Sequence, residues 1–126
     1  MIEVGAAFSS TYAEARIKFL EVAAIAGLQI NSFNHPLLGK DGETLAMDTA
    51  LQLPASGKAS DKLLILSSAC HGVEGYCGSG VQTYALHDAE WLVHARAHDV
   101  TVLYIHALNP YGFSHIRRTT HENVDL

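Results

Sequence analysis

The sequence predicts an α/β fold in which a mixed β-sheet carries flanking helices. Two continuous apolar runs, at residues 62–69 and 100–107, have the length of buried strands, and a helix-like segment separates them. This order predicts that the two strands pair in parallel through a right-handed crossover. An alternating segment and a turn lie upstream and indicate an antiparallel hairpin that leads into the parallel pair.

The first element is a helix over residues 11–26. Thr11 and Glu14 form a capping-box pattern at its start, and Gly27 is a typical C-terminal stop. Apolar side chains recur at helical spacing and give the helix one apolar face, which consists of Tyr12, Ala15, Phe19, Val22, Ala23 and Ala26.

Two strands, at about residues 28–35 and 44–53, are expected next. The turn-forming residues 39–42 lie between them and predict the hairpin. The second strand alternates, so Asp48 and Gln52 are expected on the face opposite to the apolar one, which consists of Leu45, Met47, Thr49, Leu51 and Leu53.

The crossover helix is predicted over residues 79–97. Its expected apolar face consists of Val81, Tyr84, Ala85, Leu92 and Ala95. Because both neighbouring strands are continuously apolar, we expect a sheet that is covered on both faces. His94 and His98 share one side of this helix, at the end away from the candidate site, and are interpreted as solvated surface residues rather than as a metal-binding pair.

Composition and charge narrow the classes of function. The chain has 126 residues, enough for one domain, and its 8 basic and 13 acidic residues give a net charge of −5. A mildly acidic chain lacks the basic surface that nucleic-acid binding requires, and no uncharged apolar stretch of about 18 residues could span a membrane. Two cysteines, Cys70 and Cys77, and the absence of a signal-peptide pattern predict a cytoplasmic protein with buried thiols.

Candidate functional residues gather where the two parallel strands end, because function in open α/β sheets collects beyond the carboxyl ends of strands. His71 and Glu74 lie three residues apart in a strand-to-helix turn, and Gly72 and Gly75 let that turn be tight. An imidazole and a carboxylate that converge in this way are good zinc ligands. The alternative is a hydrogen-bonded core histidine and an acid that the helix dipole favours.

The strings SSACHGVEGYCGSGVQ and HALNPYGFSHIRRTTHENVDL resemble the zinc carboxypeptidase family, and the resemblance covers essentially the whole chain. It is strongest to a bacterial branch of carboxypeptidase-like metallopeptidases. It implies that His71 and Glu74 are the first two zinc ligands and that Asn109 belongs to an Asn-Pro-x-Gly turn beside the site. It also implies that Arg117 or Arg118 polarises the scissile carbonyl, a role that suits a permanently charged guanidinium. A solvated basic pair is the alternative for these arginines.

The same resemblance implies that residues 1–126 are the N-terminal part of a single carboxypeptidase-like catalytic domain, with a phosphorylase/hydrolase-like fold. In the family, a third zinc ligand, a general-base glutamate and a carboxylate-binding Asn-Arg pair lie further downstream, so the chain is expected to be truncated after Leu126. His106 ends the second parallel strand. His106 is a candidate for contact with the substrate or for a contact that supports a zinc ligand. The alternative is a packed histidine at the strand end.

Three functions are therefore open at this stage. The first is a zinc-dependent, carboxypeptidase-type amide hydrolase, and the second is a deacylase of N-acylated amino acids with a related fold. The third is a catalytically inactive α/β module. The expected cofactor is Zn²⁺, held weakly by two ligands, and the expected partner is a peptide or an acylated amino acid. Neither nucleic acid nor a membrane is expected as a partner, and the apolar runs at 62–69 and 100–107 predict self-association.

Overall fold

A four-stranded mixed sheet, with the strand order β1-β2-β4-β3, forms the centre of the fold in the computed structural model, which describes residues 2–126. β1 (Gln29–Leu38) and β2 (Thr44–Gln52) form an antiparallel hairpin, and β2 also pairs antiparallel with β4 (Thr101–His106). β4 pairs in parallel with β3 (Leu63–Ser67). The predicted α/β class, the hairpin and the parallel pair are confirmed.

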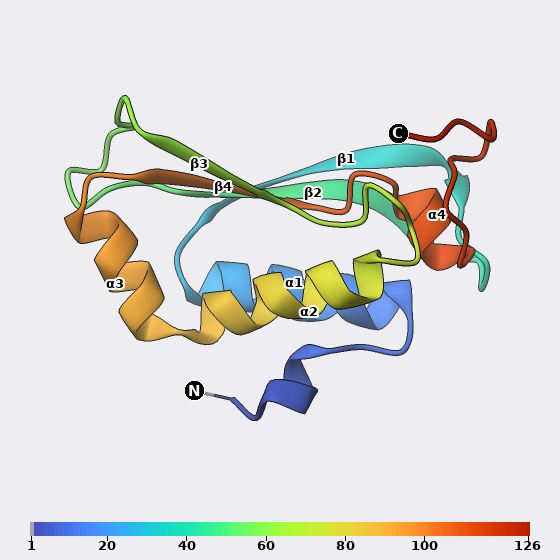
Figure 1. The fold of residues 1–126 in the computed structure, drawn as a ribbon, viewed down its shortest axis with the longest axis horizontal. Helices are drawn as coiled ribbons and strands as arrows, with labels where there is room; N and C mark the ends of the chain where they lie inside the picture. The colour runs from blue at the N-terminus through green and yellow to red at the C-terminus, as the bar shows by residue number, and fades with distance from the viewer. Residues whose placement is uncertain (1) are drawn as a thin grey trace.

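The helices lie on one side of this sheet (Figure 1). α1 (Tyr12–Ile25) and α2 (Gly75–His87) pack side by side, and α3 (Ala89–Ala97) continues from α2. A short 3-10 helix, η1 (Val4–Ala7), contacts α2, and α4 (Pro110–Ser114) follows β4. Apolar side chains from α1, α3 and the central strands fill the space between the layers, with Phe19, Val102 and Tyr104 fully buried.

The start and the end of α1 agree with the sequence prediction. Thr11 Oγ1 accepts a hydrogen bond from the backbone N–H of Glu14 at 3.1 Å, which satisfies a donor in the first turn. The Glu14 carboxylate binds the backbone N–H of Ser10, one residue before the position that a capping box uses. Gly27 has φ +72°, so the chain leaves the helix in the left-handed conformation that glycine tolerates.

The predicted single helix over residues 79–97 is wrong, because the structure has two helices there. α2 begins earlier, at Gly75, and ends at His87. Asp88 then adopts an extended conformation, and its carboxylate accepts hydrogen bonds from the N–H groups of Glu90 and Trp91, at 2.9 and 3.2 Å. An aspartate in this position is a strong N-cap, so it starts α3 as a separate helix.

The buried side of α2 also differs from the prediction, since Val81 is 57% exposed. Apart from Leu86, the buried residues of this helix are small or polar: they are Gly75, Ser79, Gly80, Gln82 and Thr83. Gly80 lies against Phe8, where a Cβ atom would come within 2.3 Å of the aromatic ring. Gln82 donates to the backbone oxygens of Leu66 and Ile105, so its amide replaces apolar packing with hydrogen bonds.

The two faces of β2 are reversed relative to the prediction, because the face with Asp48 and Gln52 is the one that the helices cover. Both side chains are fully buried, and each has a partner in a helix: Arg16 of α1 binds Asp48, and Gln52 donates to the backbone oxygen of Leu92. A buried polar group is tolerated when it is paired in this way. The alternation of side chains along β2 was therefore predicted correctly, but the choice of which face is buried was not.

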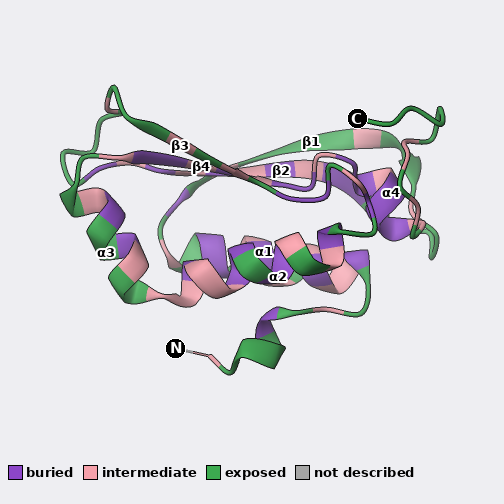
Figure 2. Ribbon diagram, viewed as in Figure 1, coloured by how far each residue is buried: buried purple, intermediate pink, exposed green. Residues whose placement is uncertain are grey.

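The opposite face of the sheet carries no helix within residues 2–126, so the expected coverage of both faces is wrong (Figure 2). By its pairing with Met47, Phe33 lies on this open face, as does Ile65 by its pairing with Leu103. Phe33 and Ile65 are 56% and 52% exposed, and β3 is an edge strand. Exposed apolar area of this kind is typical of an interaction surface, so self-association stays a prediction.

The two cysteines are not buried as expected. Cys70 follows β3 and Cys77 lies in the first turn of α2, and both are free and exposed. Within residues 2–126, no helix is both long enough and apolar enough to cross a membrane.

Candidate metal centre

The loop that carries His71 and Glu74 begins where β3 ends. The backbone N–H groups of Leu108 and Asn109 donate to the carbonyls of Ser68 and Ala69, at 3.0 and 2.8 Å, and tie the loop to the segment after β4. Ala69 has φ +56°, a left-handed conformation that costs a non-glycine residue about 1–3 kcal/mol and that clusters at functional sites. The parallel pairing of β3 with β4 therefore brings both candidate segments to one edge of the sheet.

Gly72 is required by a close approach of two backbone segments. A Cβ atom at this position would lie 2.0 Å from the carbonyl carbon of Gly112 and 2.4 Å from the carbonyl oxygen of Arg117. The N–H of Gly72 also donates to the carbonyl of Arg118 at 3.4 Å. The turn after His71 can therefore lie against α4 and the segment that follows it only with glycine here.

We expect Gly72→Ala to lower the free energy of unfolding by about 1–3 kcal/mol, because backbone atoms cannot move aside as a flexible side chain would. Urea denaturation measures this change. The matched control is Gly5→Ala, since a Cβ atom at Gly5 would meet no atom within 4 Å. Equal stability of the two variants would contradict the close packing of this turn.

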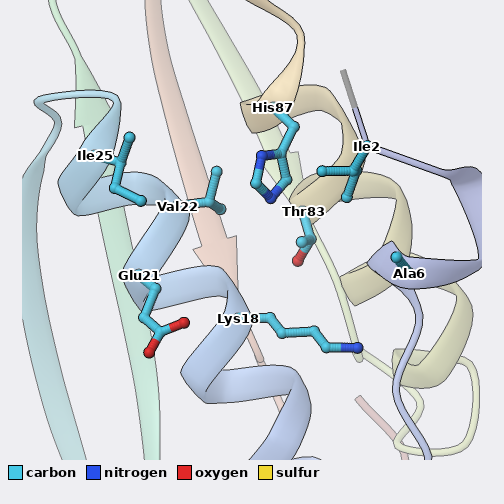
Figure 3. A pocket seen from close by; sticks show the side chains of 8 residues that line it. All are labelled: Ile2, Ala6, Lys18, Glu21, Val22, Ile25, Thr83 and His87. Atoms are coloured by element: carbon cyan, nitrogen blue, oxygen red, sulfur yellow. The ribbon is translucent and has the colours of Figure 1, made fainter.

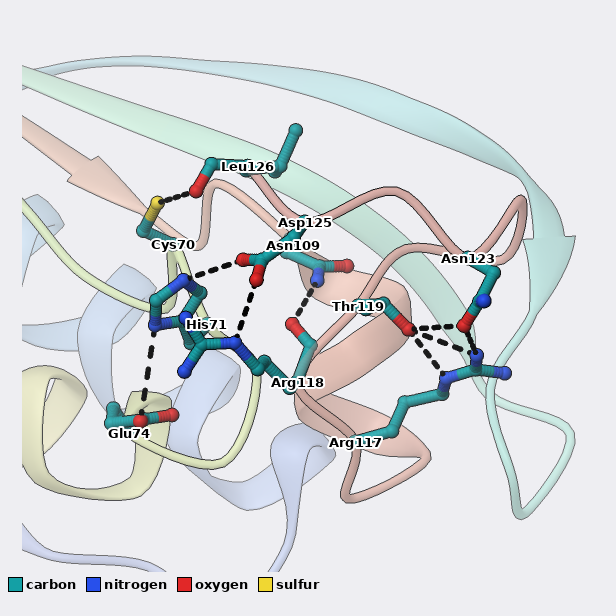
Figure 4. Close-up of polar contacts among 10 residues, drawn as sticks. All are labelled: Cys70, His71, Glu74, Asn109, Arg117, Arg118, Thr119, Asn123, Asp125 and Leu126. Carbon is teal, nitrogen blue, oxygen red and sulfur yellow. Dashed lines mark hydrogen bonds and ion pairs between the residues drawn. The ribbon is translucent and has the colours of Figure 1, made fainter.

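His71 lies between two carboxylates (Figure 4). Its Nε2 is 2.8 Å from Oδ1 of Asp125, and its Nδ1 is 3.9 Å from Oε1 of Glu74. The first distance is that of a hydrogen bond and the second is too long for one. The Asp125 carboxylate thus holds the imidazole of His71 at Nε2, and a gap separates Nδ1 from the Glu74 carboxylate.

The charge on Asp125 decides which nitrogen of His71 carries the proton. The Nε of Arg118 donates to Oδ2 of Asp125 at 2.8 Å, and this hydrogen bond lowers the pKa of the Asp125 carboxyl. An ionised carboxylate only accepts hydrogen bonds, so Nε2 of His71 is the donor. In the neutral ring, Nδ1 then has the free lone pair. Nδ1 is the ring nitrogen that lies nearer to Glu74.

The separation of Nδ1 of His71 from Oε1 of Glu74 fits two ligands of one zinc ion. Ligands that bind a tetrahedral zinc ion at about 2.1 Å lie roughly 3.4 Å from each other. The observed 3.9 Å needs only a small rotation of Glu74, whose side chain is 64% exposed. Within residues 2–126, however, no three His, Cys, Asp or Glu side chains are grouped so that they could hold a metal ion. The described residues therefore fit two positions of a metal site.

The structure separates the two arginines that the sequence left open. Arg118 binds Asp125 and so belongs to the group around His71. Arg117 binds Thr119 Oγ1 and Asn123 Oδ1, both at 2.9 Å, and its guanidinium lies 6.0 Å from the centre of the Tyr111 ring. The two guanidinium groups thus have different partners.

Asn109 is buried and supports the segment that carries Arg118. Its Oδ1 accepts from the N–H of Gly112 at 2.8 Å and caps α4, and its Nδ2 donates to the carbonyl of Arg118 at 3.3 Å. This asparagine therefore fixes the backbone rather than presenting its amide to a ligand.

His106 lies in the core, at the end of β4. Its ring stacks on Phe19 of α1 at 4.7 Å, and its Nε2 is 2.7 Å from Oγ of Ser79 in α2. These partners belong to the helix layer, so the ring has the surroundings of a packed strand-end histidine.

Asp125 is the member of this group that sequence reasoning missed. It lies in the exposed stretch at 121–126, and nothing about its spacing from His71 links the two. The available signal was its place in the string NVDL, which the family resemblance had already included without assigning the aspartate a role.

A separate cavity of about 180 Å³ lies between η1, α1 and α2 and is lined by Lys18, Thr83 and His87, among others (Figure 3). None of the residues around His71 lines it. It is therefore a different place on the molecule from the candidate metal centre.

The fold and the site together define a mixed α/β protein with a His/Glu pair at the carboxyl ends of parallel strands. The chain belongs to the family described as "Protein of unknown function (DUF2817)", which matches residues 8–126. No curated protein matches the chain. Among solved structures, a glutaminyl cyclase from Porphyromonas gingivalis is similar, with a TM-score of 0.42 and 15% sequence identity. The match covers 83% of this chain and 47% of that one, so the chain spans about half the length of the solved structure.

Proposed function

We propose that His71 and Glu74 are two ligands of a catalytic zinc ion in a carboxypeptidase-type amide hydrolase. The observation that carries this proposal is the orientation of His71. Its Nε2 is held by ionised Asp125, and its Nδ1 lies 3.9 Å from the Glu74 carboxylate. Histidines that bind metals usually donate their other ring N–H to a carboxylate or a carbonyl, which fixes the tautomer and makes the ligand more basic.

The chemistry of a peptide amide fits the groups around this pair. Zinc, when bound, supplies a Lewis acid and lowers the pKa of a coordinated water. Arg118 is fixed through Asp125 and offers further N–H donors, which suit the oxygen of a polarised carbonyl. Arg117, by contrast, has its guanidinium engaged with Thr119 and Asn123. We therefore assign the polarisation of the substrate carbonyl to Arg118. The substrates that we propose are peptides.

Zinc binding to the purified chain tests the ligand assignment directly. Two protein ligands are fewer than the three that a catalytic zinc takes, so we expect weak binding and little stabilisation by zinc. His71→Ala and Glu74→Ala should each remove this binding. Asp125→Asn should weaken it about 10–100-fold, because a neutral amide replaces the charged carboxylate that orients His71. The absorption spectrum of bound Co²⁺ and equilibrium dialysis with Zn²⁺ measure these changes in a His94→Gln/His98→Gln background, so that the adjacent histidines of α3 do not contribute to the bound metal.

Arg117→Ala is the matched control, since its guanidinium lies outside the His71 group and should leave zinc affinity unchanged. Unaltered zinc affinity in both His71→Ala and Glu74→Ala would overturn the ligand assignment.

Hydrolysis is tested with a blocked dipeptide and an N-acylated amino acid as parallel substrates. We expect Glu74→Ala to abolish turnover and Arg118→Ala to lower kcat while zinc stays bound. Faster hydrolysis of the N-acylated amino acid would identify the activity as that of a deacylase rather than a peptidase. This outcome would leave the proposed zinc ligands unchanged. A Glu74→Ala variant as active as wild type would refute the zinc mechanism.

A further inference from the structure

A pair of imidazoles lies at the other end of the molecule from His71. His94 is in the last turn of α3 and His98 is its C-terminal cap, one helical turn apart, and both side chains are exposed. Their ring centres are 4.1 Å apart and their planes are inclined by 34°. Figure 1 shows α3 at one end of the molecule and α4, beside the candidate zinc ligands, at the other.

A hydrogen bond in this pair fixes the tautomer of His98. Nδ1 of His98 is 2.9 Å from the carbonyl oxygen of His94. A carbonyl only accepts, so Nδ1 carries the proton, and in the neutral ring Nε2 has the free lone pair. A backbone carbonyl that binds the second ring nitrogen is the support that metal-binding histidines usually have.

The spacing suits chelation by a single ion. Histidines at positions i and i+4 present both rings on one side of a helix. Two nitrogens bound at about 2.1 Å in adjacent positions of an octahedral or square-planar ion lie roughly 3 Å apart. Rings whose centres are 4.1 Å apart can place their edge nitrogens at that separation. Glu90 lies one turn before His94 on the same side of α3, and its negative charge favours a cation.

The geometry points to a transition-metal site on α3, in which His94 and His98 chelate one divalent ion and water fills the other positions. Imidazole nitrogens without thiolates select Cu²⁺, Ni²⁺ and Zn²⁺ over Mg²⁺ and Ca²⁺, and Cu²⁺ is the tightest of the first-row series. This site is independent of the proposed zinc site at His71. It gives a function to two histidines that the sequence analysis interpreted as solvated surface residues.

Calorimetric titration of the chain with Ni²⁺ tests the site. We expect His94→Gln and His98→Gln each to weaken the Kd by at least about 10-fold, because each change removes one of two chelating nitrogens. His87→Gln removes a histidine of the preceding helix and should bind as wild type. His71→Ala should also keep this binding, which separates the α3 site from the proposed zinc ligands.

Substoichiometric Cu²⁺ provides a second measurement that does not rely on the glutamine variants. The paramagnetic ion should broaden the imidazole proton signals of His94 and His98 before those of any other histidine. Wild-type Ni²⁺ affinity in both glutamine variants, or earlier broadening of another histidine pair, would overturn the α3 site.

Discussion

Asp48→Ala is expected to lower the free energy of unfolding by about 3–5 kcal/mol, which is a large part of the stability of a typical domain. Asp48 is fully buried in the sheet, and its two oxygens accept from Nε and Nη2 of Arg16 at 2.7 and 3.1 Å. Ser32 Oγ donates to the same carboxylate at 2.5 Å. Removing the carboxylate leaves the charge of Arg16, whose side chain is only 20% exposed, without its counter-ion. Urea denaturation at neutral pH measures the loss.

Two control variants separate the ion pair from the rest of the network. Ser32→Ala removes one hydrogen bond and should cost about 1 kcal/mol. The double variant Arg16→Met/Asp48→Leu removes both charges and should recover most of the loss, because a buried pair is often no more stable than apolar side chains of similar volume. A loss below about 1 kcal/mol in Asp48→Ala would contradict the structural importance of this ion pair.

The second large effect is a fall in stability in acid, because the unfolded chain protonates His106 at a higher pH than the folded chain does. Burial lowers the pKa of His106 from 6.5 to about 4, against the opposing influence of Asp48, and the Arg16 charge lowers it further. Since the folded-state pKa lies below the unfolded one, the stabilisation is complete above pH 6.5 and is lost as the pH falls through 4. At 1.36 kcal/mol per pKa unit, the loss is about 3 kcal/mol.

Urea denaturation at several values between pH 7 and pH 4 measures this loss. His106→Phe keeps a ring against Phe19 but cannot titrate, so its stability should fall less steeply with decreasing pH than that of the wild type. His121→Gln, a change at an exposed histidine, should follow the wild-type curve. Parallel curves for wild type and His106→Phe would show that His106 does not contribute to the acid sensitivity.

Local patterns in the sequence predicted the elements well, because their causes are local. The hydroxyl of Thr11 caps α1 and the left-handed Gly27 ends it, and both effects act within one helical turn. The two apolar runs pair in parallel as expected. The prediction of one long helix failed because helical periodicity does not show that Asp88 caps a second helix, although this cap is also local. The buried side of α2 was predicted wrongly because its glycine and polar residues are buried by contacts with other elements.

The candidate site shows the same division. His71 and Glu74 are three residues apart, so the sequence alone could propose that they converge. The choice between Arg117 and Arg118, and the participation of Asp125, depend on how the segment at 117–126 folds back onto the turn at Gly72. His106 could be placed at the strand end but not in the core, because its partners come from α1 and α2.

The sequence by itself determined the α/β class, the antiparallel hairpin, the parallel pair of strands, and the His-x-x-Glu turn at the end of β3, since each follows from periodicity, turn chemistry or short spacing. Only the tertiary structure decided which face of the sheet is buried. A strand with alternating side chains can turn either face to the helices, and here Arg16 of α1 and the backbone of Leu92 in α3 pair with Asp48 and Gln52. The free energy of those contacts depends on residues 32 and 40 positions away along the chain, which no local pattern records.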